Sequence, residues 1–231
     1  MRSASRQRRR ALSNNPRAAR TRAALVAAGR RLSSERPIEA VAIDDIVSAA
    51  EVGKGSFYNH FTDREALARA ISAEIRALIE QRVDEANASE TDPAMRIARA
   101  MCTFVRFALD DPERGRIIAR AQPGFASPSA RLNRGVVADI EKGMRTNRLS
   151  VETLEAGTLF VVAVTHALLG RVLEKRKRGL AGHLAQDACA LTLQGLGIRE
   201  REAREIAASA VDTIVRRRAF RPDAGDRLFS P

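Results

Sequence analysis

The sequence IDDIVSAAEVGKGSFYNHF, residues 43–61, sets the architecture of the chain. Ile43, Ile46 and Val47 recur at helical spacing, and two carboxylates stand in the first turn, where the helix dipole favours them; a short amphipathic helix is therefore predicted. Residues 51–53 break this pattern, and a second short helix is predicted for residues 54–61. Two short helices joined by a three-residue turn indicate a helix-turn-helix, whose second helix can lie in the major groove of DNA.

The second of these helices has two contrasting faces. Phe57 and Phe61 are four residues apart and are expected to face inward, together with Val52, onto the first helix. The remaining positions carry small or polar residues: Lys54, Gly55, Ser56, Tyr58, Asn59 and His60. Short polar side chains can read base edges, basic and hydroxyl groups can contact phosphates, and glycine permits close approach of the backbone. These residue types predict an interface with duplex DNA, and a plain helical hairpin is the structural alternative.

Helical periodicity continues on both sides of this segment, while strand signals are almost absent. Asn15-Pro16 predicts the start of a helix that Pro37 closes, and the run from Thr62 to Glu65 matches a capping box that opens a long helix. Further helical segments are expected from Asp92-Pro93 to Pro112, from near Ser129, after Ser150, over residues 184–196 and over residues 199–218, with the basic segment 175–179 as a separator. The chain is therefore predicted to be all-α.

Four parts are predicted along the chain. They are a basic disordered arm over residues 1–14, a DNA-binding domain over residues 15–71 with its motif at about 42–61, a larger helical body over residues 72–220, and a disordered tail over residues 221–231. A chain of 231 residues with 45% hydrophobic residues is long enough and apolar enough to bury a core.

Positive charge is concentrated at the N-terminus. The formal net charge is +12, with 40 basic against 28 acidic residues. Eight arginines and no acid occur in residues 1–22: Arg2, Arg6, Arg8, Arg9, Arg10, Arg17, Arg20 and Arg22. The rest of the chain is close to neutral, so a polyanionic partner is indicated for this end, either nucleic acid or an anionic membrane. A solvated tag that only keeps the protein soluble is the simpler alternative.

Several classes of protein are disfavoured by the sequence. The N-terminus has no apolar stretch of the kind a secretory signal needs, and the weakly polar stretch Ala156–Gly170 is shorter than the roughly 18 residues of a membrane span, so a cytoplasmic protein without a membrane partner is expected. Cys102 and Cys189 are predicted to be buried free thiols. The three histidines show no metal-ligand spacing, and no catalytic constellation, metal site or cofactor site is predicted.

Residues Thr21–Ile71 resemble the DNA-binding domain of the TetR family of bacterial transcriptional regulators. The resemblance is carried by the run Val52–Phe61 and by Arg64-Glu65-Ala66-Leu67 after it. It implies a three-helix head, a larger ligand-binding body, and a homodimer that binds a palindromic operator and leaves it when a small molecule binds. Carried over by position, it implies DNA contacts by Lys54, Ser56, Tyr58, Asn59 and His60, with Arg64 reaching a phosphate. Arg17, Arg20 and Arg22 lie near the start of the first helix and are expected to reach phosphates too.

Some positions depart from the family pattern. Ser33 stands where the family usually has Phe, and Pro37 where it usually has Gly. Ala42 replaces the usual capping Thr of the second helix, and Asp44 is an acid facing the DNA side, so no contact is assigned to it. Glu51 replaces the usual Gly of the turn, which makes the turn geometry the point to examine.

The body offers fewer signals. An apolar ligand pocket is predicted from Met101, Phe104, Phe107 and Phe125, with Thr165 and His166 as polar groups, although ordinary core and interface roles are the simpler alternative for all six. The apolar helix Leu154–Leu173 is expected to be buried on most sides. Helices at about 152–174 and 183–196 match the place where TetR-family members dimerise.

Two rival functions belong to other classes. A sequence-independent DNA-packaging protein agrees with the basic arm and high isoelectric point but not with the near-neutral body. A helical enzyme with an accessory DNA-binding head is the second rival, and the absence of paired carboxylates or a metal cluster argues only weakly against it.

Overall fold

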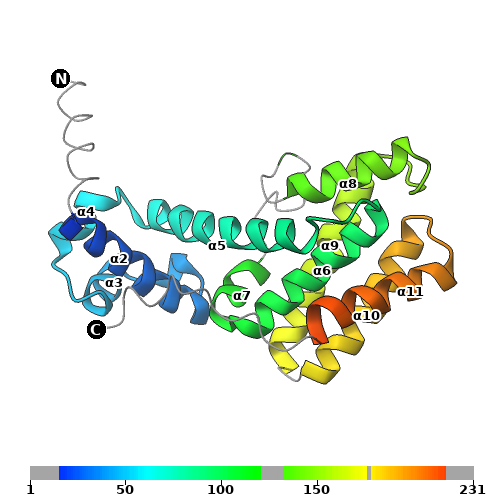
Figure 1. Ribbon diagram of the computed structural model, residues 1–231. Helices are drawn as coiled ribbons and strands as arrows, with labels where there is room; N and C mark the ends of the chain where they lie inside the picture. The colour runs from blue at the N-terminus through cyan, green and yellow to red at the C-terminus, as the bar shows by residue number, and fades with distance from the viewer. Residues whose placement is uncertain (1–15, 121–128, 130–132, 176–177, 217–231) are drawn as a thin grey trace. The chain divides into compact units, whose positions relative to one another are not determined.

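The computed structural model describes residues 16–120, 129, 133–175 and 178–216, and all regular structure in these residues is helical (Figure 1). The all-α prediction is confirmed. The described residues form two compact units: the first lies within Met1–Gln81 and Asp111–Gln122, and the second within Arg82–Asp110 and Pro123–Pro231. We call the first unit the head and the second the body. The predicted arm, the predicted tail and Phe125 lie outside the described residues.

The head is built from short helices and part of a long one: α2 (Pro16–Glu35), η1 (Ile38–Ala40), α3 (Ile43–Ala49), α4 (Lys54–His60), the first part of α5 (Arg64–Ala86), and α7 (Pro112–Ala119). Helix α7 was not predicted as a separate element, although Asp111 before Pro112 is a capping signal. The Asp111 side chain accepts a hydrogen bond from the Arg114 amide at 3.0 Å. The predicted boundary at residue 71 lies within α5.

The start of α5 corrects one detail of the prediction. The capping side chain is Asp63 rather than Thr62, because Asp63 Oδ1 accepts the Ala66 amide at 2.6 Å. The Thr62 hydroxyl instead donates to Asp63 at 2.9 Å. These two bonds hold the pKa of Asp63 below its usual value, the backbone bond from Ala66 first.

A continuous apolar core holds the head together. Leu25 on α2, Ile46 on α3, Phe57 on α4 and Leu67 on α5 are fully buried. Helices α2 and α5 approach so closely at Gly29 that a Cβ there would lie 2.8 Å from the Leu67 side chain. Because four elements share this core, the position of α4 is set by the whole head rather than by its own seven residues.

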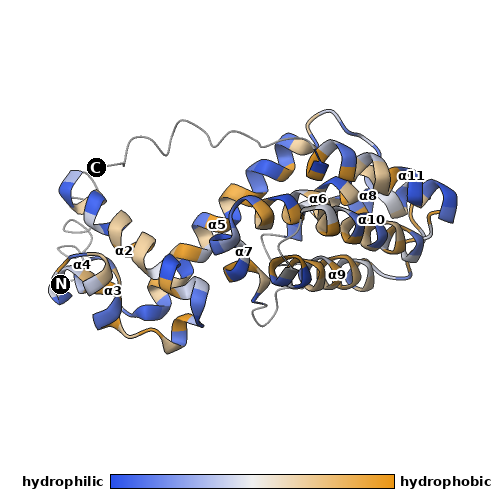
Figure 2. Cartoon of the chain, turned by 90° about the horizontal axis from the view of Figure 1, so that it is seen from below, coloured by the Kyte–Doolittle hydropathy of each residue, from blue (hydrophilic) through white to orange (hydrophobic). Residues whose placement is uncertain are grey.

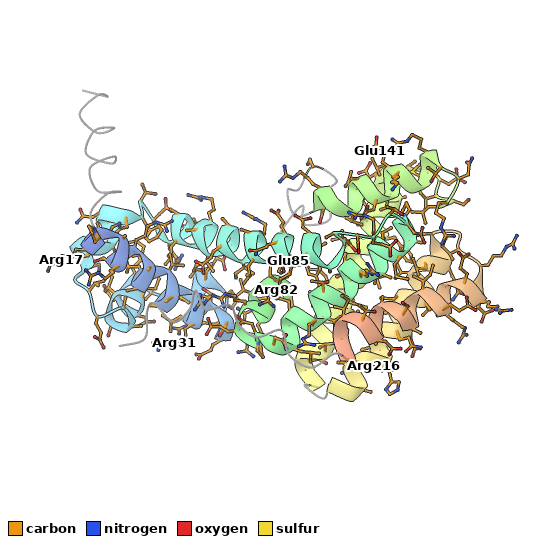
Figure 3. The ribbon with its side chains drawn as sticks, in the orientation of Figure 1. Arg17, Arg31, Arg82, Glu85, Glu141 and Arg216 are labelled. Carbon is orange, nitrogen blue, oxygen red and sulfur yellow. The ribbon has the colours of Figure 1, made fainter. Side chains whose placement is uncertain are left out.

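The body packs its helices around α6 (Pro93–Asp110), which contacts α8 (Arg134–Arg145), α9 (Leu154–Lys175), α10 (Arg178–Gly195) and α11 (Glu200–Val211). A π-helical turn, η3 (Asp212–Arg216), follows α11. Helix α9 ends at Lys175 and α10 begins at Arg178, so both helix ends lie within the predicted separator 175–179, and α10 begins six residues before the predicted start at Leu184. Arg82, labelled in Figure 3, places its guanidinium 5.1 Å from the centre of the Phe107 ring.

The two cysteines meet in the core of the body. Both are buried and free, which confirms the prediction. Cys102 Sγ on α6 lies 3.9 Å from Cys189 Sγ on α10. The contact with Cys189 and then burial raise the pKa of the Cys102 thiol well above its usual range, so it is neutral and unreactive at physiological pH.

Helix α9 is hydrophobic along much of its length (Figure 2), and the prediction that it is buried on most sides is met only in part by the single chain. Val161, Leu168 and Val172 pack into the body core, whereas Leu159 and Phe160 are 53% and 40% exposed in the single chain. The apolar stretch Leu154–Glu174 has 21 residues and is, by length and composition, long enough to cross a membrane. This stretch is longer than the predicted stretch Ala156–Gly170, so its length alone does not exclude a membrane span. Because one side of the helix packs into the body core, a core helix is favoured.

Candidate nucleic-acid interface

The turn between α3 and α4 is fixed by two backbone hydrogen bonds. The Val52 amide donates to the Val47 carbonyl at 3.0 Å, and the Glu51 amide donates to the Ser48 carbonyl at 3.1 Å. This pair of bonds is a Schellman motif, which places the residue after the cap in the left-handed region. That residue is Glu51, with φ of 54°. The turn therefore forms despite the replacement of glycine, at a conformational cost.

The body contains the same motif twice, with better-suited residues. Asn147 follows α8 with φ of 54°, and Gly197 follows α10 with φ of 91°. In each case the two bonds recur, from Asn147 and Arg148 in one motif and from Gly197 and Ile198 in the other. Glycine adopts this region freely, asparagine tolerates it, and glutamate is the least suited of the three.

We expect Glu51→Gly to raise the free energy of unfolding by about 0.5–1 kcal/mol, because it removes a left-handed Cβ at the cost of some unfolded-state entropy. Asn147→Gly is the matched control and should raise it less. Chemical denaturation of both variants measures the difference. An equal or larger gain from Asn147→Gly would show that glutamate is no less suited to this conformation than asparagine, and no gain from Glu51→Gly would show that the turn before α4 carries no strain.

The inward face of α4 is as predicted. Phe57 is fully buried and Phe61 is 4% exposed, above Ile46 and Val47 of α3 in the head core. Their rings lie 5.8 Å apart, and the Tyr58 ring meets Phe57 edge-on at 5.4 Å. These contacts fix the rotation of α4 about its axis and so determine which side chains face outward.

The outward face of α4 carries the predicted DNA-contacting residues. Lys54, Gly55, Tyr58 and Asn59 are exposed, and Tyr58 keeps 53% of its surface despite its size. Ser56 and His60 are half-buried. A Cβ built at Gly55 meets nothing within 4 Å, so the fold itself does not require glycine at this position. The DNA contacts assigned to these residues stay predictions.

Lys54 is held by an acid on the neighbouring helix. Its Nζ lies 2.7 Å from Asp44 Oδ1 in the first turn of α3. The hydrogen bond to Asp44 raises the pKa of Lys54 above its ordinary value. The pair joins two helices, so no spacing within one element could have indicated it. Asp44 competes with any phosphate for this cation.

Arg22 and three residues at the end of α4 share one open pocket. Arg22 places its guanidinium 5.4 Å from the Phe61 ring centre and lines this pocket together with Tyr58, Asn59 and His60. Burial, and then the charge of Arg22, lower the pKa of His60. A neutral imidazole can still donate one N–H to a phosphate oxygen. The structure thus brings one predicted arginine of α2 to the predicted reading helix.

The other predicted arginines have different surroundings. Arg64 donates from Nη1 to the Val41 carbonyl at 3.2 Å, before α3, so its guanidinium braces the head. Arg17 and Arg20 are exposed near the start of α2, where Figure 3 labels Arg17. The carbonyl of Arg17 accepts the Thr21 hydroxyl at 3.0 Å within the helix.

The predicted ligand residues of the body lie on two helices that pack together, α6 and α9. Met101 and Phe107 are buried, and Phe104 is half-buried. On α9, the Thr165 hydroxyl donates to the Val161 carbonyl at 2.7 Å, and His166 Nδ1 lies 3.1 Å from the Val162 carbonyl. Burial lowers the pKa of His166. Their role in binding a ligand stays a prediction.

Two family models match the chain. Residues 25–71 match "Bacterial regulatory proteins, tetR family", and residues 92–209 match "Tetracyclin repressor-like, C-terminal domain". The second match alone covers about half of the sequence, and the first includes the whole of the segment 43–61.

Individual proteins are similar to the chain over different lengths. The HTH-type transcriptional repressor DhaR of Mycobacterium sp. strain GP1 is 36% identical over 72 residues, which cover 31% of this chain and 36% of the repressor, so the match spans about a third of that relative. The structure of RolR in complex with resorcinol has a TM-score of 0.56 and 28% identity, covering 81% of this chain and 93% of RolR. A TetR-family transcription regulator from Shewanella sp. PV-4 has a TM-score of 0.68 at 13% identity, covering 78% and 99% of the two chains, and supports the fold alone.

Proposed function

The chain belongs to the TetR family of bacterial regulatory proteins and is a transcription regulator rather than an enzyme, and from this premise we propose that it is a repressor that binds a palindromic operator as a homodimer. A small molecule in the body releases it. The observation that carries the proposal is the outward face of α4, which presents polar and small residues while its large rings are buried.

Helix α4 is the reading helix in this proposal. Ser56 and Asn59 contact base edges, and Tyr58, His60 and Arg22 contact phosphates. Glycine at position 55 weakens the helix, and the open space around it shows that the fold does not require it there. A close approach of the DNA backbone would explain this glycine. Lys54 contacts DNA only after it leaves Asp44, which makes this contact the weaker one.

A homodimer is supported by apolar side chains on α9 and α10 that a single chain leaves in water. Leu159, Phe160, Leu180 and Leu191 are the exposed large hydrophobic residues on these two helices. Phe160 also rests against α10, where a Cβ on Gly195 would lie 2.6 Å from its ring. Burying these faces against a second copy forms a four-helix interface. Its two heads would meet successive major grooves about 34–36 Å apart.

A small-molecule effector is supported by the likeness to RolR, whose structure contains resorcinol. In this chain Met101, Phe104 and Phe107 supply apolar surface, and Thr165 and His166 supply hydrogen-bonding groups. The effector binds more tightly to the dimer conformation whose heads do not fit the operator. The free energy of DNA binding is then weakened by the difference in effector-binding free energy between the two conformations.

The proposal places the protein in the cytoplasm, as TetR-family regulators are soluble DNA-binding proteins. The packaging alternative is less well supported, because a packaging protein needs attraction to phosphates but no shaped reading face.

Asn59→Ala tests the assignment of α4. We expect it to lower affinity for the operator by about 5- to 150-fold, the cost of one lost base contact, and to leave affinity for random DNA unchanged. Tyr58→Phe is the matched comparison, since loss of a phosphate contact should weaken binding to both DNAs equally. Fluorescence anisotropy at fixed salt measures both. An Asn59→Ala variant with unaltered operator affinity would remove Asn59 from the interface.

A further inference from the structure

A cavity of about 480 Å³ lies in the head, and none of its lining residues belongs to α3 or α4. It is bounded by the end of α2, by η1, by the middle of α5 and by α7. We call it the head cavity. Its volume falls within the range of about 300–1,000 Å³ that is usual for sites that hold small molecules.

The lining of the head cavity is rich in arginine. Arg69 and Arg76 on α5 and Arg120 after α7 line it, against a single acid, Glu39. Within the described part of the chain, the only carboxylate near Arg69 is that of Asp63, at 3.8 Å. The lining therefore carries a net positive charge, which favours an anionic ligand.

Two of these arginines make no ion pair in the described residues. Arg120 donates to the main-chain carbonyls of Ser33 and Ser34 at the end of α2. Carbonyl oxygens at a helix C-terminus compensate its positive charge only in part. Among the described residues, Arg76 has neither a hydrogen bond nor an ion pair. A carboxylate placed between them would gain two charge-assisted hydrogen bonds.

A buried hydroxyl in the same lining also lacks a partner. Ser33 is 5% exposed, and its Oγ has no hydrogen-bond partner among the described residues. Leaving such a group unpaired costs about 1–3 kcal/mol. The Oγ atom is closed to solvent in this structure, so a ligand oxygen recovers this cost once the Ser33 side chain turns toward the cavity that the residue lines. This cost does not depend on the arginine charges, and it also favours a ligand that offers an oxygen atom as a hydrogen-bond acceptor.

The rest of the lining is apolar and excludes a bare inorganic anion as the best occupant. Pro37 and Ile38 at η1, Ile71 on α5 and Ile117 on α7 supply hydrocarbon surface. An inorganic anion would leave this surface in contact with water, and a neutral hydrocarbon would leave the arginines uncompensated. A ligand with a carboxylate and a hydrocarbon part satisfies both.

We propose that the head cavity binds a small organic carboxylate. The carboxylate pairs with Arg76 and Arg120 and accepts a hydrogen bond from Ser33 Oγ, and the hydrocarbon part packs on Ile38, Ile71 and Ile117. The site lies in the unit that carries α4 and is separate from the effector site proposed for the body. It does not depend on the dimer or on the operator.

Calorimetric titration of the full chain with octanoate tests the proposal, with 1-octanol and inorganic phosphate as comparison probes. Octanoate is expected to bind saturably, one per chain, at least tenfold more tightly than either comparison probe. Failure of octanoate to bind at about 1 mM, or binding of phosphate as tight as that of octanoate, would overturn the proposal.

Three variants locate the binding. Arg76→Gln removes one charge and should weaken octanoate binding at least tenfold, and Ser33→Leu should weaken it as well, because it removes the hydroxyl and narrows the cavity. Arg201→Gln is the control, because Arg201 is an exposed arginine of α11 paired with Glu205, and it should bind octanoate as the parent chain does. Thermal melts establish that each variant is folded. Unaltered binding in folded Arg76→Gln would place octanoate elsewhere and contradict the proposal, whatever Ser33→Leu does.

Discussion

Replacing both Leu159 and Leu191 with aspartate is expected to convert the protein from a dimer to a monomer and to lower operator affinity by about 10²–10⁴-fold. The two leucines are 53% and 66% exposed on α9 and α10 in the single chain. In the proposed dimer both are buried, so each aspartate would place an unpaired charge in an apolar interface at a cost of several kcal/mol. The loss of affinity follows because one head alone forfeits the simultaneous binding of two half-sites.

Sedimentation or light scattering measures the oligomeric state, and anisotropy measures the affinity. Ser209→Asp on α11 is the control, since it adds the same charge at an exposed position outside α9 and α10. It should remain dimeric. A double variant that is folded and still dimeric would show that α9 and α10 do not form the interface.

Deleting residues 1–14 is expected to weaken binding to all DNA and to flatten its salt dependence. The deletion removes five arginines, Arg2, Arg6, Arg8, Arg9 and Arg10. Each phosphate that they neutralise contributes about 0.9 to the slope of log affinity against log salt, so the slope should fall by up to about 4.5 per chain. The ratio of operator to random-DNA affinity should change little, because phosphate contacts carry no sequence information.

A matched variant separates charge from chain length in this experiment. Replacing the same five arginines with lysine keeps the charge and should keep the salt slope, while replacing them with glutamine should reproduce the deletion. An unaltered slope after the deletion would show that the arm does not contact DNA.

Local patterns predicted helix α4 and its two faces well. Phe57 and Phe61 are four apart, and this spacing was enough to predict which face of α4 is buried and which residues remain outside. The helix-turn-helix followed for the same reason, because each of its signals lies within one or two turns of helix. The left-handed conformation of Glu51 could be anticipated only because the TetR family usually has Gly at this position of the turn.

Features that join distant segments could not be predicted in this way. The ion pair of Lys54 with Asp44 connects two helices, and its geometry depends on how they cross. The head cavity requires α7, whose residues lie more than 70 positions after Ser33 in the sequence. The exposed side of α9 could not be located from the sequence, because its composition is apolar nearly all round and only packing distinguishes the side that faces the core from the side left for a partner.

A dimeric regulator that reads a specific DNA sequence should enrich one site when bound sequences are selected from random DNA. The affinity of the enriched site is then compared with that of a scrambled copy at one salt concentration. We expect a two-fold symmetric site bound at least about 10³-fold more tightly than its scrambled copy. Failure to enrich any site, or equal affinity for the two DNAs, would contradict this expectation and favour a packaging protein.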